Sequence, residues 1–167
     1  MRLRDRGLDG PKFQMREKIM AIGDDFWIED DDGNKVYKVN GKAARLRDTF
    51  ILEDASGNEL SKIQEKKLTV RDKMTIERGN TKATVHKRLL GIRDHYIIEV
   101  DDAPDLKAHG NVVDHEYEIE RDGDTVAKVS KKWFRVREAY GVDVAAGEDT
   151  ALILALTVAI DSLTSRG

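Results

Sequence analysis

The feature that most restricts the fold is an uncharged apolar run close to the C-terminus. Residues 151–160 include no charged side chain, and the acidic segment 148–150 before them suits the start of a helix. The apolar residues do not form a stripe but point in every direction around a period of 3.6. We therefore expect a helix at about 149–164, buried on all sides, whose structural core residues are Leu152, Leu154, Leu156, Val158 and Ile160.

Two environments can bury such a helix. A bilayer core requires about 20 apolar residues, and this run has about half that number before Asp161 and Ser162 interrupt it. The other environment is a protein sleeve, because a β-barrel of about 11 strands has room for a central helix about 10 to 12 Å wide. The helix length therefore favours a barrel core and predicts no transmembrane span.

The preceding part of the chain repeats a pattern that is typical of β-hairpins. Short alternating apolar runs flank turns of Gly with Asp or Asn at 26–39, 50–63, 74–85 and 117–129. Gly79-Asn80 suits a type II′ turn and Asp122-Gly123 a type I′ turn. In residues 134–144 the apolar side chains fall on even-numbered positions, and only Glu138 breaks this pattern. The segment 101–105 is predicted to be a loop. We predict a mainly β fold, a closed antiparallel barrel in a single domain (1–167), with strands at about 12–145 around the helix.

Composition excludes several classes of protein. The chain is 40% hydrophobic and 37% charged, which is too apolar for a disordered chain. It contains no cysteine, so disulfides, thiolate metal sites and cysteine nucleophiles are excluded. A net charge of -3 provides no overall basic field, and we expect no nucleic-acid partner. Because no apolar secretory segment follows the N-terminus, we expect a cytoplasmic location, with peripheral membrane association left open.

Short motifs spread over nearly the whole chain carry a family resemblance. In the first third they are Ile28-Glu29-Asp30, Gly33-Asn34, Leu52-Glu53-Asp54 and Gly57-Asn58-Glu59-Leu60. Later they are Gly110-Asn111, Tyr117-Glu118-Ile119, Gly123, residues 126–134 (VAKVSKKWF), Tyr140-Gly141-Val142, Asp149, Leu154-Ala155 and Ala159-Ile160-Asp161. Together these motifs resemble the LURP-one-related family. The resemblance implies a tubby-like architecture shared with phospholipid scramblases, a twelve-stranded antiparallel barrel threaded by a hydrophobic C-terminal helix. It does not by itself assign an activity.

A calcium loop is the first candidate site, because Asp30, Asp31, Asp32 and Asn34 lie close together and scramblase relatives respond to calcium. An EF-hand loop counted from Asp30 would need glycine at its sixth position and glutamate at its twelfth. Here glycine is fourth and Gly41 is twelfth. We therefore interpret the segment as a solvated hairpin turn.

Catalytic and metal sites find little support in the pattern of residues. The four histidines, His86, His95, His109 and His115, have no metal-ligand spacing. Asp114-His115 is predicted to lie in a β-like run, where adjacent side chains point to opposite faces, and the same holds for Ser130-Lys131. We expect no catalytic residues, no metal site and no cofactor.

The remaining candidate is a basic surface that binds anions. The residues that could form it are Lys66, Lys67, Arg71, Lys73, Lys87, Arg88, Arg93, Lys131, Lys132, Arg135 and Arg137. Tubby-like relatives bind phosphoinositide head groups, so the resemblance implies an anion or lipid head-group patch, for which we favour Lys131, Lys132 and Arg135. The alternative is an ordinary charged barrel surface, with Trp133-Phe134 belonging to the core.

Three functional hypotheses follow. The first is a non-enzymatic intracellular binding module for an anionic lipid head group, a small anion or a protein partner. The second is a lipid-handling protein of the scramblase type, which requires membrane association and a mobile C-terminal helix. An enzyme is the third, and it would require a pocket of titratable groups with strongly perturbed pKa values. The sequence leaves the oligomeric state open.

Overall fold

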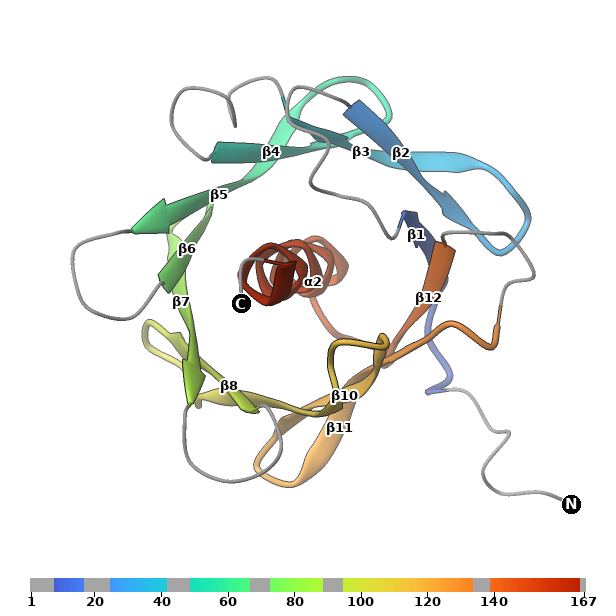
Figure 1. Cartoon of the computed structure of the whole chain (residues 1–167). Coiled ribbons are helices and arrows are strands. Elements are labelled where there is room, and N and C mark those ends of the chain that lie inside the picture. The colour runs from blue at the N-terminus through green and yellow to red at the C-terminus, as the bar shows by residue number, and fades with distance from the viewer. Residues whose placement is uncertain are drawn as a thin grey trace, which may run out of the picture.

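The computed structural model describes residues 8–16, 25–41, 49–66, 73–88, 95–133 and 139–165. Within these ranges, twelve antiparallel strands form a closed barrel, and the helix α2 (Thr150–Ser165) runs through its centre (Figure 1). This confirms the predicted fold. The strands are β1 (Lys12–Arg16), β2 (Asp25–Asp30), β3 (Lys35–Asn40), β4 (Thr49–Asp54), β5 (Glu59–Lys66), β6 (Lys73–Arg78), β7 (Thr81–Arg88), β8 (His95–Val100), β9 (Leu106–Asn111), β10 (Glu116–Arg121), β11 (Asp124–Ser130) and β12 (Ala139–Val144).

The barrel has the simplest possible connectivity. Each strand pairs with its neighbour in sequence, and β1 closes the ring by pairing with both β2 and β12. At this seam Phe13 lies opposite Val142, and Met15 lies opposite Tyr140. Among the twelve described strands, closure leaves no sheet edge to pair with another chain. It also brings the first and last strands together, which local sequence patterns do not reveal.

The predicted turns form between the expected strands. Asp122 and Gly123 both have positive φ, 53° and 86°, as a type I′ turn between β10 and β11 requires. The Asp54 carboxylate closes the β4–β5 turn by accepting the backbone N–H groups of Ser56 and Asn58, each at 2.9 Å. The predicted loop at 101–105 lies between β8 and β9. Glu138 and the apolar positions predicted at 134 and 136 lie outside the described residues.

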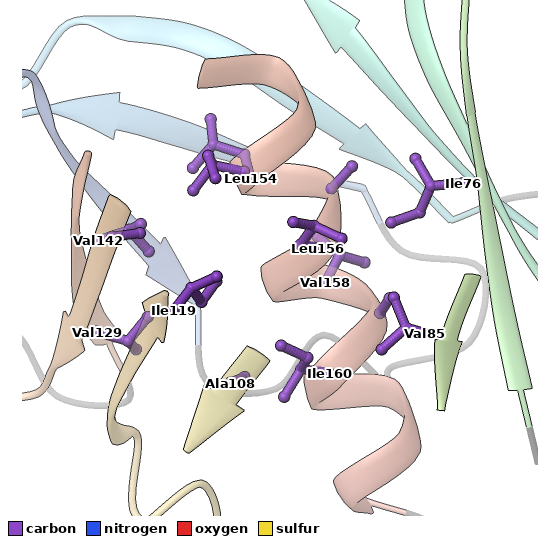
Figure 2. Close-up of a cluster of buried hydrophobic side chains, with 14 of the residues drawn as sticks. Ile76, Val85, Ala108, Ile119, Val129, Val142, Leu154, Leu156, Val158 and Ile160 are labelled. Carbon is purple, nitrogen blue, oxygen red and sulfur yellow. The ribbon is translucent and has the colours of Figure 1, made fainter. Parts of the chain in front are cut away.

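The core consists of the inward side chains of the strands and most of α2. Leu154, Leu156, Val158 and Ile160 are fully buried, whereas Leu152 is half-buried and packs against the edge of the core. Figure 2 shows these four helix residues between barrel side chains that approach from both sides; the labelled ones are Ile76, Val85, Ala108, Ile119, Val129 and Val142. The barrel therefore buries the apolar side chains on all sides of a helix that has no polar face.

Polar contacts attach both ends of α2 to the barrel. At its start, Arg121 forms a two-pronged ion pair with Glu148 at 2.9 Å, and Arg78 lies 3.4 Å from Asp149. Asp149 also accepts the backbone N–H of Leu152, as an N-cap residue does. Toward its C-terminal end, the Tyr96 hydroxyl lies 2.7 Å from the Thr164 hydroxyl. Among the described residues, no helix is both long and apolar enough to cross a bilayer.

Candidate anion-binding site

The segment that leaves β11 holds two of the favoured lysines. The Glu116 carboxylate on β10 accepts the Ser130 hydroxyl at 3.0 Å and the backbone N–H of Lys131 at 3.1 Å. The Ser130 hydroxyl oxygen in turn accepts the backbone N–H of Lys132 at 3.1 Å. These bonds set the direction of the chain beyond the strand, so that Lys132 is exposed and Lys131 is half-buried. Arg135, the third favoured residue, lies outside the described residues.

Trp133 follows these lysines and is exposed over 37% of its surface. Only one other large hydrophobic residue of the described part, Val113, is exposed. The interpretation of Trp133 as a core residue is therefore wrong, because the Glu116 bonds turn the chain outward before this position. The Lys12 ammonium on β1 lies 6.0 Å from the centre of the indole ring, which is cation–π distance.

A hollow of about 390 Å³ lies beside Trp133 on the outer surface of β9, β10 and β11. Outward side chains alternate in charge across this surface. In the strand register His109 faces Glu118, Glu118 faces Lys128, Lys128 faces Asp143, and Asp143 faces Lys12. The residues that line the hollow include His109, Glu116, Glu118, Lys128, Lys132 and Trp133.

Asp143 sits between two of these lysines and is almost fully buried, because residues before β1 cover it. The backbone N–H of Leu8 donates to its carboxylate at 3.1 Å. Burial raises the pKa of Asp143 above its ordinary value, although Lys12 and Lys128 act in the opposite direction. The lysines therefore flank a carboxyl group that is shielded from solvent.

Lys12 thus lies near one exposed aromatic ring, and Lys128 and Lys132 line the same hollow as that ring. We call Lys12, Lys128, Lys132 and Trp133 the Trp133 face. Lys128 is 3.8 Å from Glu118, and both side chains are about one third exposed, so their attraction is weak. The Lys132 ammonium makes no ion pair within the described part of the chain. This face can therefore offer positive charge to an external anion beside an indole ring.

Sequence reasoning missed Lys12, Lys128 and Glu116 as members of the site. Alternation along 126–130 places Lys128 outward, but only the register and the β1–β12 closure place Lys12 near it. The other predicted basic residues are elsewhere. Lys66, Lys73, Lys87 and Arg88 lie on β5, β6 and β7, at least four strands from β11 around the barrel. Lys67, Arg71, Arg93 and Arg137 lie outside the described residues.

The acidic turn at 30–34 uses its first carboxylate internally. Asp30 accepts the backbone N–H groups of Asp32 and Asn34 and the side-chain amide of Asn34, at 3.0, 2.9 and 3.1 Å. The backbone N–H of Asn34 lowers the pKa of Asp30 below its ordinary value. Asp54 makes the same set of bonds in the next hairpin. The turn therefore has a structural explanation that involves no ion.

The histidines occupy three different settings. His86 lies 3.1 Å from Glu99, and His109 lies 2.8 Å from Glu120 with its ring stacked on His95. His115 is buried, 3.0 Å from Asp161 of α2, and stacks on the ring of Tyr140. The hydroxyl of Tyr140 donates to the same Asp161 carboxylate. His115 thus contributes to holding α2.

The prediction that Asp114 and His115 lie in a β-like run is wrong. They lie in the turn between β9 and β10, where His115 has a φ of 55°. Asn111 forms this turn, because its side-chain oxygen accepts the backbone N–H of Asp114 at 3.2 Å and its amide donates to the Asp114 carboxylate at 2.7 Å. Ser130 does end a strand, but Lys131 lies in the bend that follows, so the prediction that the two are neighbours on a strand is wrong for Lys131.

Comparison with known proteins gives one family and one fold. Residues 12–161 match the family model described as LURP-one-related. The structure is similar to an X-ray structure of a protein from Arabidopsis thaliana, with a TM-score of 0.62 and 18% sequence identity, over 91% of this chain and 90% of that chain. At this identity the likeness shows the fold alone. No curated protein matches the sequence.

Proposed function

The chain belongs to the LURP-one-related family, and from that premise we propose that it is a non-enzymatic intracellular binding module for the phosphate-bearing head group of an anionic lipid. The observation that carries the proposal is the Trp133 face, where Lys12 lies 6.0 Å from an exposed indole and Lys128 and Lys132 line the adjoining hollow of about 390 Å³. Lys131 lies immediately before Lys132, in the segment that leaves β11.

The chemistry of this face suits a charged membrane surface. Indole rings favour the head-group level of a bilayer, because one part of the ring is apolar and its N–H is polar. Each lysine near an anionic surface contributes about 1 kcal/mol of attraction, which falls off within a Debye length. Binding should therefore depend on both lipid charge and ionic strength, and it should be reversible.

The non-enzymatic part of the proposal rests on the role of the polar groups beside the hollow. Glu116 and Ser130 bond to each other and to the backbone N–H groups of Lys131 and Lys132. Asp143 lies under the residues before β1 and accepts the backbone N–H of Leu8. These groups hold the surface in shape, which is a structural role rather than a catalytic one.

The alternative, a scramblase-type activity, requires α2 to leave the barrel. That movement would expose Leu154, Leu156, Val158 and Ile160 to water and break the contacts of Glu148, Asp149 and Asp161. Each fully buried aliphatic side chain contributes about 1.5–3 kcal/mol by burial alone, so the release of several together is comparable with the total stability of a domain. The arrangement of α2 therefore favours the binding module.

Co-sedimentation with liposomes of graded anionic lipid content, at low and at physiological salt, tests the proposal. We expect bound protein to increase with anionic lipid and to decrease with salt. Replacing Lys128 and Lys132 together by alanine should remove about 2 kcal/mol, which is roughly a 30-fold loss of affinity. A Trp133→Ala variant should also bind less, and a soluble inositol phosphate that competes would identify the head group rather than the membrane as the ligand.

The matched control changes the same number of charges elsewhere. Lys62 on β5 and Lys82 on β7 are exposed lysines on strands distant from β11. A Lys62→Ala and Lys82→Ala double variant should bind as well as the wild type. Equal losses in both double variants would mean that binding reports overall charge, and a wild type that stays in solution under every condition would refute the lipid proposal.

A further inference from the structure

One histidine and two glutamates converge on the outer surface of β9 and β10. Potential ligand atoms of His109, Glu118 and Glu120 all lie within 4.8 Å of one another, and His109 Nε2 is 2.8 Å from Glu120 Oε1. In a tetrahedral zinc site with bonds of about 2.0–2.1 Å, the ligand atoms are separated by roughly 3.4 Å. The three groups therefore need only small side-chain adjustments to reach that separation.

The backbone explains why these residues share one face. Glu118 and Glu120 are two residues apart on β10, so their side chains project from the same side of the sheet. His109 on β9 lies directly opposite Glu118 in the strand register. The positions are thus set by two paired strands in the ladder of the barrel rather than by a loop.

We propose that His109, Glu118 and Glu120 bind a divalent transition-metal ion, with zinc as the appropriate probe. One imidazole with two carboxylates is a mixed nitrogen and oxygen donor set, which suits zinc and related ions, whereas calcium and magnesium prefer oxygen ligands alone. Three protein ligands leave the fourth position of a zinc ion open to water or to another ligand. The inference goes beyond the proposed function, because it concerns a cation and stands whether or not the Trp133 face binds lipid.

The ion would replace two contacts that these side chains make now. Glu118 would exchange a 3.8 Å contact with Lys128 for a metal bond, and that pair is too exposed to contribute much. His109 Nε2 is itself shielded from solvent and lies 2.8 Å from Glu120 Oε1, so the ion has to enter beside the Glu120 side chain, which is 27% exposed, and replace that contact. A cation would also neutralise two neighbouring carboxylates on one strand.

His95 supplies a further imidazole beside the site. It lies opposite His109 in the register of β8 and β9, and the two rings stack with centroids 6.4 Å apart. Stacking against His95 restricts the orientation of the His109 ring. A group that orients a ligand typically changes metal affinity by about 10–100-fold, so we place His95 as a positioning residue.

Isothermal titration of the full chain with zinc tests the proposal. We expect one zinc ion per chain in the wild type, and an affinity at least about tenfold lower in His109→Asn and in Glu120→Gln. Zinc at about 100 times its dissociation constant should raise the melting temperature of the wild type by roughly 5–10 °C and leave that of the two variants almost unchanged. The melting temperature without zinc verifies that the variants fold.

A second histidine–glutamate pair gives the matched control. His86 lies 3.1 Å from Glu99 across β7 and β8, but within the described residues no further carboxylate or imidazole joins them in a ligand cluster. His86→Asn should therefore bind zinc as the wild type does. The proposal is overturned if the wild type takes up no zinc, if His109→Asn binds it equally well, or if His86→Asn loses as much affinity. If zinc bound only at the acidic turn 30–32, His109→Asn would bind it as well as the wild type does, and the proposal would be overturned.

Discussion

Replacing Leu156 by alanine should destabilise the protein strongly, because this residue lies at the centre of α2 and has no exposed surface. Buried leucine-to-alanine changes cost about 2–5 kcal/mol, and the value depends on how far the surroundings collapse into the space. Here α2 is enclosed by a ring of hydrogen-bonded strands that cannot close inward without breaking the ladder. We therefore expect the upper part of that range, about 3–5 kcal/mol.

The assay is equilibrium urea unfolding followed by far-UV circular dichroism, with thermal unfolding as a second measure. In a domain of this size each 1 kcal/mol lowers the melting temperature by about 2–4 °C, so the expected decrease is roughly 6–20 °C. Leu152→Ala is the comparison on the same helix. Leu152 is only half-buried, and its replacement should cost roughly half as much or less.

The difference between the two variants tests the role of α2 as barrel core. Equal losses at Leu152 and Leu156, or a loss below about 1 kcal/mol at Leu156, would mean that α2 does not fill the barrel as a packed element. Such a result would refute the burial argument and would restore a mobile helix, and with it the scramblase hypothesis, as an open alternative.

Two further changes test the surroundings of the Trp133 face. Asp143→Asn should stabilise the protein at neutral pH, because burial raises the folded-state pKa of Asp143. Between the unfolded-state and folded-state pKa values, the folded protein binds more protons than the unfolded chain. The stability of the wild type therefore decreases as pH rises through that range. The gain in melting temperature should shrink below about pH 4, and a gain independent of pH would contradict this cause. Gly110→Ala should cost more than about 2 kcal/mol, because Gly110 has a φ of 129° and an added Cβ would lie 2.8 Å from the Glu116 carbonyl oxygen. Gly79→Ala, at a φ of 60° with open space around it, should cost only about 1 kcal/mol in the same urea unfolding experiment, and equal losses would argue against the steric explanation.

The strands, turns and helix were largely predictable because each depends on residues close together in sequence. Asp122-Gly123 can adopt two consecutive positive φ angles, so it predicts the β10–β11 turn without tertiary information. The β9–β10 turn was missed because Asp114-His115 is predicted to lie in a β-like run, whereas the turn is formed by side-chain bonds of Asn111 that the spacing of apolar residues does not show. Side-chain bonds to the backbone that end a strand are not visible in the spacing of apolar residues.

The candidate site depended on tertiary structure far more than the fold did. The sequence by itself determined that the helix needs a sleeve around it, and that alternating strands joined by tight turns supply that sleeve. It could not indicate that Glu116 turns Trp133 outward, that barrel closure brings Lys12 to this ring, or that His109 faces Glu118. The physical reason is that hydrophobic period and turn chemistry are local properties of the chain, whereas register and closure are decided by which strands pair when the barrel closes around α2.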